Sequence, residues 1–441
     1  MRIQARGTGV AGRRSSRKLT VCLTLFAPVG LGACNSLLEV TDPDLVVPEA
    51  ISQSELFWGG AIGDFMDGVS SNGGMIVYVG MFTDEFELSG TFPTRLEVDE
   101  RSIQDTNGTM EGAYRDLHAA RVGAENAALL LTEEFGTDSR IGEMNNLAGF
   151  TYIYFGEVYC SGVPFGSSPV GGDFTQGTPA TTDETFQLAM DRFDAALATA
   201  DGSTTQQHLA NIGKARAQLA LGQFAAAASS VAGVPDDFVY LVRHDENAAG
   251  GDNGVYSQNV LQGRWTVADG EGTNGIAFRS AMDPRLEWEL DPDEVGFDSE
   301  TPLYRQLIFT SRNDDMPLAS GLEARLIEAE AELDDGDFPA WLGILNQLRA
   351  DAGMAGDLAD PGTTDGRVRL HFDERAWWLY ATGHRLGDLR RMIRHYGYAE
   401  DDVFPTGTHF KGSDYGNQVV FPIPEPETNN PNFTGCLNMS A

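Results

Sequence analysis

The chain has 441 residues, of which 30 are basic and 65 acidic, so its formal net charge is −35. This length permits one large domain or two medium domains with a substantial hydrophobic core. The acidic excess argues against nucleic-acid binding, which needs clustered lysine and arginine to release counterions. It also argues against attachment to anionic lipids through a basic patch.

The first 33 residues have the pattern of a cleaved export signal. They contain six basic side chains and no acidic one, and an apolar stretch covers residues 19–31. That stretch is shorter than the roughly 18–20 apolar residues that cross a membrane. The sequence Leu-Gly-Ala-Cys that ends at Cys34 resembles the bacterial lipobox, whose cysteine is acylated and becomes residue one of the mature protein. We therefore predict lipidation of Cys34; the alternative is an ordinary signal peptide with a chance cysteine.

Cleavage before Cys34 would leave 24 basic against 65 acidic side chains, so membrane attachment would have to come from the lipid alone. Residues 34–50 contain two prolines and predict an extended tether. The rest of the chain, 51–441, is predicted to be a single helical domain. Apolar residues spaced three and four positions apart mark one buried face of a helix, and this spacing predicts helices at 111–131, 142–159 and 182–199.

Two later segments, 214–231 and 323–353, each predict a pair of helices joined by a glycine-containing turn. Alanine at i and i+4 lets two helices approach closely, and this pattern resembles tetratricopeptide (TPR) units, which stack to bury a shared core. We therefore predict a mostly α fold of TPR-like helix pairs with long irregular loops. No stretch of about 18 uninterrupted apolar residues follows the leader, so we expect no membrane span.

Four cysteines occur in the chain: Cys22 lies in the predicted leader, Cys34 is the predicted lipid attachment site, and Cys160 and Cys436 remain. In an exported protein two remaining cysteines can pair, because the compartment is oxidising. We predict a disulfide between Cys160 and Cys436 that ties the C-terminal tail to the body. Two free buried thiols are the alternative.

Motifs for catalysis or metal binding are absent from the sequence. It has no HExxH, GxSxG or P-loop, and no spaced Cys/His set for zinc. We therefore expect no catalytic residue, metal or cofactor. A carboxylate pair for glycoside cleavage stays open as an alternative, because with 65 acidic residues almost any spacing occurs by chance.

The C-terminal segment 372–397 carries a distinctive charged pattern: Glu-Arg near its start, then Gly-His-Arg, then Asp-Leu-Arg-Arg. A Pro-Ile-Pro…Asn-Pro ending follows in 419–433. An aromatic helix that runs into Gly-x-Pro, an Asp-Pro-Arg element and the segment after Cys34 complete the set, at 147–166, 281–288 and 37–44. In this order and spacing the motifs resemble the SusD/RagB family, the surface lipoproteins that serve TonB-dependent nutrient transporters.

The resemblance implies a SusD-like fold and a binding protein rather than an enzyme. It implies capture of an oligosaccharide, or another polymer fragment or peptide, and its delivery to a TonB-dependent outer-membrane transporter. It also implies a lipid anchor in the outer membrane and exposure on the cell surface. Two alternatives stay open: an exported TPR-like scaffold that binds another protein, and a secreted glycoside hydrolase.

The residues of segment 374–394 also have a structural interpretation. Buried aromatic residues alternate with charges at helical spacing, and Arg385 and Asp388 are close enough for a pair on the same face. We expect these residues, and His384 beside them, to hold the C-terminal helix and tail together rather than to contact a ligand.

Two loop regions, 81–101 and 246–275, are the predicted ligand-binding site. Helices packed as pairs leave binding to loops, and a ligand needs an exposed apolar surface with polar groups at its edge. The family resemblance agrees, since its members bind glycans with loop aromatics and neighbouring polar side chains. For Phe82 and Trp265 the alternative is a buried role in the core. The predicted ligand-binding residues are Phe82, Asp84, Glu85, Phe92, Arg95, Tyr256, Arg264 and Trp265.

Overall fold

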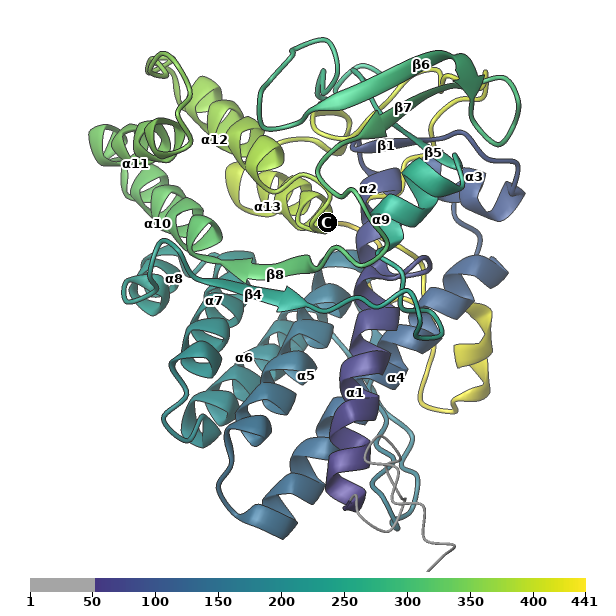
Figure 1. Cartoon of the computed structure of the whole chain (residues 1–441), viewed down its shortest axis with the longest axis vertical. Coiled ribbons are helices and arrows are strands. Elements are labelled where there is room, and N and C mark those ends of the chain that lie inside the picture. The colour runs from purple at the N-terminus through teal and green to yellow at the C-terminus, as the bar shows by residue number, and fades with distance from the viewer. Residues whose placement is uncertain (1–51) are drawn as a thin grey trace, which may run out of the picture. The chain divides into compact units, whose positions relative to one another are not determined.

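Helices make up most of the regular structure in residues 52–441, the range that the computed structural model describes (Figure 1). Residues 51–441 pack as one unit. The predicted leader, Cys34 and the predicted tether lie outside the described residues. The mostly α fold class is confirmed. None of the helices in the described range is both long and apolar enough to span a bilayer.

The N-terminal half is a row of helices that pack mainly on their neighbours. The row consists of α1 (Gln53–Ser70), α4 (Gly108–Phe135), α5 (Ser139–Val158), α6 (Thr182–Thr199), α7 (Thr204–Ala220) and α8 (Phe224–Val231). Helix α1 packs on α4, and from α4 to α8 each helix packs on the next. The helices predicted at 111–131, 142–159 and 182–199 are confirmed as α4, α5 and α6.

The starts of these helices follow from their capping residues. At α1 the Ser52 side chain accepts from the backbone of Glu55, and the Glu55 side chain accepts from the backbone of Ser52. Thr181 and Glu184 form the same reciprocal pair at α6. Each pair satisfies two backbone donors that the first turn leaves without an intrahelical partner.

Small residues allow α5, α6 and α7 to approach one another. A Cβ at Gly213 in α7 would lie 2.2 Å from the ring of Phe193 in α6, and one at Gly149 in α5 would lie 2.6 Å from the same ring. The Phe193 ring is fully buried between them. The close approach of α5, α6 and α7 therefore requires glycine at these two positions, which lie outside the alanine-rich segments noted in the sequence.

A second helix group follows in sequence, and Figure 1 shows it beside the first. Helix α10 packs on α11 and also on α8, which joins the two groups. The turn between α10 and α11 contains Gly336 in the left-handed conformation (φ +82°), and Asp337 caps α11. The helix pairs predicted at 214–231 and 323–353 are thus confirmed. The bounds of this group are α10 (Gly321–Asp335), α11 (Phe338–Asp351), α12 (Thr364–Trp378) and α13 (Arg385–Tyr396).

The strands in the described range form antiparallel pairs only. The pairs are β1 (Phe86–Leu88) with β5 (Trp265–Val267), β2 (Val163–Pro164) with β3 (Pro179–Ala180), β4 (Val239–Val242) with β8 (Met316–Ser320), and β6 (Trp288–Val295) with β7 (Pro302–Gln306). The β1–β5 pair joins the two predicted loop regions directly, because Leu88 lies opposite Trp265. Short helices α2 (Met75–Phe82), α3 (Pro93–Asp99) and α9 (Gly254–Tyr256) flank it.

Buried ion pairs hold α12 and α13 in the fold. Arg375 forms two 2.9 Å hydrogen bonds to the Asp388 carboxylate. Arg391 bridges Asp388 at 2.9 Å and Glu330 of α10 at 2.8 Å. The predicted Arg385–Asp388 pair is wrong, because Arg385 binds Asp84 instead. The structural role predicted for segment 374–394 is nevertheless confirmed, because its charged residues pair with one another and with α10 inside the fold.

The C-terminal tail returns to the first helix group. A disulfide links Cys160, just after α5, to Cys436 (S–S 2.01 Å). Backbone bridges beside it pair Tyr159 with Phe421 and Ser161 with Asn438. The tail is therefore tied to the end of α5 by both covalent and hydrogen bonds.

Candidate ligand-binding surface

Four of the predicted ligand-binding residues are buried, which contradicts an exposed binding role for them. Phe82, Asp84, Glu85 and Trp265 each expose no more than 1 % of their surface. Phe82 packs edge-on against Phe421, with ring centres 4.9 Å apart. The Trp265 ring lies 5.9 Å from that of Phe86. These two aromatic residues anchor their segments in the core, which was the alternative interpretation.

The carboxylates of Asp84 and Glu85 face the C-terminal helices rather than solvent. Asp84 accepts two 2.7 Å hydrogen bonds from Arg385 of α13 and one of 2.9 Å from the Ile276 N–H. Oε1 of Glu85 accepts from the Ala381 N–H at 2.9 Å, and burial raises the pKa of Glu85 to about 8. Asp84 therefore joins the segment after α2 to α13, and Glu85 joins it to the turn between α12 and α13; neither belongs to the candidate site.

Three other predicted residues do come together at the surface. Phe92 is 44 % exposed, and the guanidinium of Arg264 lies 4.6 Å from the centre of its ring, with that of Arg95 at 5.1 Å. A residue that the sequence did not predict completes the group: Phe297 is 52 % exposed, and its ring centre lies 4.4 Å from the Arg264 guanidinium. We call Phe92, Arg95, Arg264 and Phe297 the Phe–Arg cluster. Tyr256 is half-buried and packs against the core.

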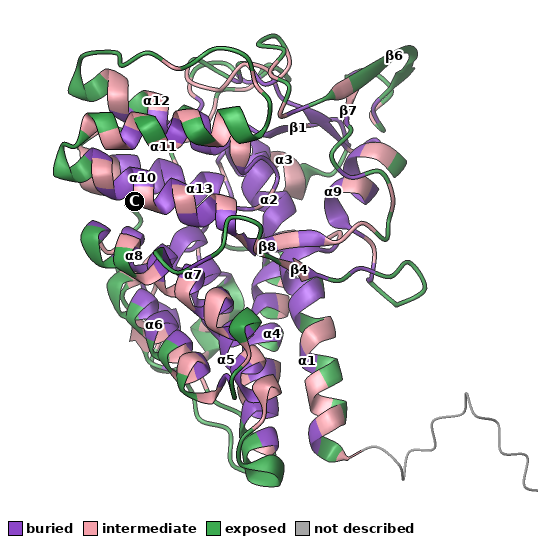
Figure 2. Ribbon diagram, turned by 60° about the vertical axis from the view of Figure 1, so that its left-hand side comes forward, coloured by how far each residue is buried: buried purple, intermediate pink, exposed green. Residues whose placement is uncertain are grey.

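Backbone hydrogen bonds between three segments build the Phe–Arg cluster. Beyond the β1–β5 pair, the Ser89 N–H donates to the Arg264 carbonyl at 2.9 Å, which aligns the chain that leads to Phe92. The Phe297 N–H donates to the Gly263 carbonyl at 2.7 Å. Strand β6, which leads to Phe297, is largely exposed, as Figure 2 shows. Backbone hydrogen bonds thus hold the three segments of the cluster in place, while its two phenylalanine side chains are exposed to solvent.

The electrostatics of the Phe–Arg cluster are unusual for so acidic a chain. Among the described residues, neither Arg95 nor Arg264 forms an ion pair with a carboxylate. Arg95 donates to the Gln258 side chain at 3.0 Å, and Nε of Arg264 has no hydrogen-bond partner within the chain. Burial and the charge of Arg95 lower the pKa of Arg264. Arg264 therefore contacts both exposed rings and Arg95 contacts one of them, and neither guanidinium is paired with an acid in the described range.

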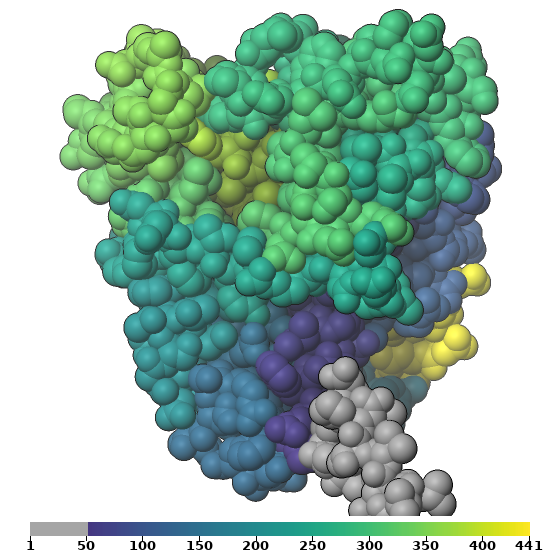
Figure 3. Space-filling view, viewed as in Figure 1, coloured from purple at the N-terminus to yellow at the C-terminus, as the bar shows by residue number. Residues whose placement is uncertain are grey.

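Several cavities lie elsewhere in the described range, and two of them are alternative candidate sites. One of about 560 Å³ opens beside the β4–β8 pair and is lined by Trp378 of α12, visible as a hollow in the upper part of Figure 3. There Arg285 is paired with Glu374 at 2.6 Å and stacks 4.8 Å from the Trp378 ring centre. The other, about 440 Å³, lies between α4 and the C-terminal tail and includes exposed Phe174. Both volumes suit small ligands, but neither cavity is lined by a predicted residue.

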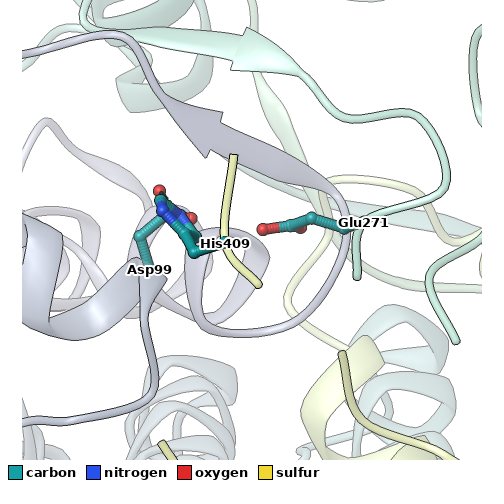
Figure 4. A group of neighbouring side chains, drawn as sticks. All are labelled: Asp99, Glu271 and His409. Atoms are coloured by element: carbon teal, nitrogen blue, oxygen red, sulfur yellow. Dashed lines mark hydrogen bonds and ion pairs between the residues drawn. The ribbon is translucent and has the colours of Figure 1, made fainter. Parts of the chain in front are cut away.

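A buried cluster of Asp99, Glu271 and His409 was not predicted either. Nε2 of His409 lies 2.9 Å from the Asp99 carboxylate, and the Glu271 carboxylate points toward this pair (Figure 4). Potential ligand atoms of the three residues lie within 4.8 Å of one another, and burial raises the pKa of both carboxyl groups. One imidazole nitrogen and two carboxylates are suitable ligands for a divalent cation. The same contacts also tie the loop at His409 to the end of α3.

No family model matches the sequence, and no curated protein matches it either. Solved structures do match in fold. A SusD-like carbohydrate binding protein from Bacteroides vulgatus has a TM-score of 0.62 at 16 % identity, covering 86 % of this chain and 96 % of its own. Surface glycan-binding protein A from Bacteroides uniformis has a TM-score of 0.65 at 12 % identity, covering 87 % and 98 %. A SusD/RagB family protein from Bacteroides thetaiotaomicron has a TM-score of 0.64 at 14 % identity, covering 86 % and 95 %.

Proposed function

We propose that this chain, which has the SusD-like fold, binds an oligosaccharide through the Phe–Arg cluster and works as a non-catalytic member of the SusD/RagB family. The observation that carries the proposal is the pair of exposed rings, Phe92 and Phe297, on either side of Arg264, on a fold shared with structures named as glycan-binding proteins. The remaining predicted steps, lipidation at Cys34, attachment to the outer membrane and delivery to a TonB-dependent transporter, belong to the same proposal.

The chemistry of the Phe–Arg cluster suits a sugar. A sugar ring has apolar C–H faces that stack on aromatic rings and hydroxyls that accept hydrogen bonds from guanidinium groups. Each stacked ring should contribute on the order of 1–3 kcal/mol. Two rings and two arginines then suggest a dissociation constant in the rough range of micromolar to millimolar.

The first experiment measures binding of an oligosaccharide panel by calorimetry for the unmodified protein, Phe92→Ala, Phe297→Ala and the control Phe174→Ala. Each variant of the cluster should weaken binding about tenfold, with circular dichroism and melting temperature nearly unchanged because both rings are exposed. Phe174 is an exposed aromatic residue of the 440 Å³ cavity. A loss confined to Phe174→Ala would move the site to that cavity, and absence of binding to any glycan would refute the proposal.

A second experiment separates the proposal from its two alternatives. Native mass spectrometry after pull-down from detergent-solubilised membranes should show a β-barrel transporter as the co-purifying protein. A soluble protein partner in its place would favour the TPR-like scaffold. Release of reducing ends from a polysaccharide panel would favour the glycoside hydrolase and contradict a purely binding role.

A further inference from the structure

We infer that the glycan recognised by the Phe–Arg cluster is anionic and carries carboxylate or sulfate groups. This inference rests on the proposed function and specifies its ligand class. It starts from the two arginines of the cluster, Arg95 and Arg264, neither of which forms an ion pair with a carboxylate of the described residues.

Most other arginines of the described range are paired with a carboxylate. Arg375, Arg385 and Arg391 each meet a carboxylate at 2.9 Å or less. Exposed arginines are paired too: Arg115 lies 3.3 Å from Asp116, although 71 % of its side chain is accessible. With 65 acidic residues in the chain, carboxylates are abundant.

Among the arginines of the described range that form no ion pair with a carboxylate, Arg101 and Arg390 are buried and donate to backbone carbonyls. Arg279 stacks on Tyr304. Arg95 and Arg264 differ in lying side by side next to two exposed rings.

The two guanidinium groups also disfavour each other. Partial burial and, second to it, the charge of Arg95 lower the pKa of Arg264, so an anion beside the two guanidinium groups would favour their charged forms. A carboxylate or sulfate would relieve this repulsion, and the planar guanidinium fork can donate two parallel hydrogen bonds to either group. Nε of Arg264 is buried without a partner, so bonds to an anion would come from the two terminal nitrogens, which form no hydrogen bond with the described residues.

The flanking rings determine what kind of anion fits. Phe92 and Phe297 lie 4.6 and 4.4 Å from the Arg264 guanidinium, so an anion that reaches Arg264 also meets apolar ring surface. A sugar with a charged substituent offers both a C–H face and an acidic group, whereas a free inorganic anion offers only charge. The net charge of −35 would repel an acidic polymer from most of the surface, so its binding depends on this local positive potential.

The test uses matched ligand pairs that differ in charge. Oligogalacturonate is compared with its methyl ester, and a sulfated galactan oligosaccharide with its desulfated form, by calorimetry at about 50 mM and about 500 mM salt. We expect at least one charged member to bind about tenfold more tightly than its neutral partner. This preference should shrink at high salt, because exposed charges are screened. The carboxylate and sulfate arms show which acidic group is preferred.

Variants assign the preference to the cluster. Arg95→Gln and Arg264→Gln should each bring the affinity ratio of charged to neutral glycan close to one, whereas Arg115→Gln, a matched exposed arginine on α4, should leave the ratio unchanged. Equal binding of both members of each pair, or a ratio that survives both substitutions, would overturn the inference. In either of those outcomes glycan binding itself stands; if no glycan of any charge binds, the proposed function fails as well.

Discussion

Glu85 shows what a single buried acid does to the molecule. Its carboxyl is fully buried, one oxygen accepts from the Ala381 N–H, and the other has no partner. Burial is the main reason that the pKa of Glu85 rises from 4.5 to about 8. The folded protein therefore keeps a proton at Glu85 that the unfolded chain loses at lower pH.

The pH dependence of stability follows from this difference. Between pH 4.5 and about 8 the unfolded chain binds fewer protons at this position than the folded one, so the free energy of unfolding should fall as pH rises. In Glu85→Gln this group no longer titrates, and urea denaturation at several pH values should show a shallower fall than in the unmodified protein. Burial also raises the pKa of Glu87, to about 7, which acts in the same direction. Part of the fall in unfolding free energy with pH therefore remains in the variant. Parallel curves for the two proteins would contradict the assignment.

Asp84 and Arg385 bind each other, although the sequence did not predict this contact. We predicted Asp84 in the ligand site and Arg385 paired with Asp388, yet the two residues form an ion pair across 301 positions of the chain. Helical spacing identifies which charges share a face, but not which distant carboxylate lies opposite. No property of either residue's neighbours in sequence reveals that partner.

At the scale of helices, packing depends on two glycines that meet one ring. Gly213→Ala would place a methyl group 2.2 Å from the Phe193 ring, so α6 and α7 would have to move apart. We expect a loss of about 1–3 kcal/mol in unfolding free energy, as is usual for overpacking. The matched control is Gly343→Ala in α11, which meets nothing within 4 Å and should gain up to about 1 kcal/mol through helix propensity. Equal melting temperatures for the two variants would show that the helices do not approach as described.

The helices could be predicted because their signal is local. The buried face of α4 includes Tyr114, Leu117, Ala120 and Ala124, which recur at the spacing of three and four that the sequence shows directly. The segments between helices have no such period. Their buried and exposed side chains are set by pairing with distant segments, so the sequence alone left Phe82 and Trp265 open between two roles.

The candidate site was only partly predictable for the same reason. Arg264 and Trp265 are neighbours, and successive side chains of an extended segment point to opposite sides. The β1–β5 pairing decides that Trp265 faces the core and Arg264 faces Phe92. Phe297 follows Gly296 in an acidic stretch, and only the backbone bond from Phe297 to Gly263 brings it to the cluster. Likewise, Asp99, Glu271 and His409 come from three distant segments and share no motif.

At the scale of the whole molecule, the proposed attachment to the membrane rests on one residue outside the described range. If Cys34 is the acylated residue, its removal leaves no lipid, and the acidic excess of the chain offers no basic patch for anionic lipid. Two acyl chains suffice for stable anchoring, at about 0.8 kcal/mol per buried CH₂. Cys34→Ala should therefore abolish metabolic palmitate labelling and move the protein from the membrane to the soluble fraction. Unchanged labelling would show that the lipobox interpretation is wrong.

The Cys160–Cys436 disulfide turns more than half of the chain into a covalent ring, because its two ends are 276 positions apart. The exposed segment 245–250 lies inside this ring. A protease that cuts there opens the ring once, and the two pieces stay attached through the sulfur bridge and through the packed core. Such a nicked molecule keeps its two pieces together until a reductant is added, so under oxidising conditions one cut would not release a fragment.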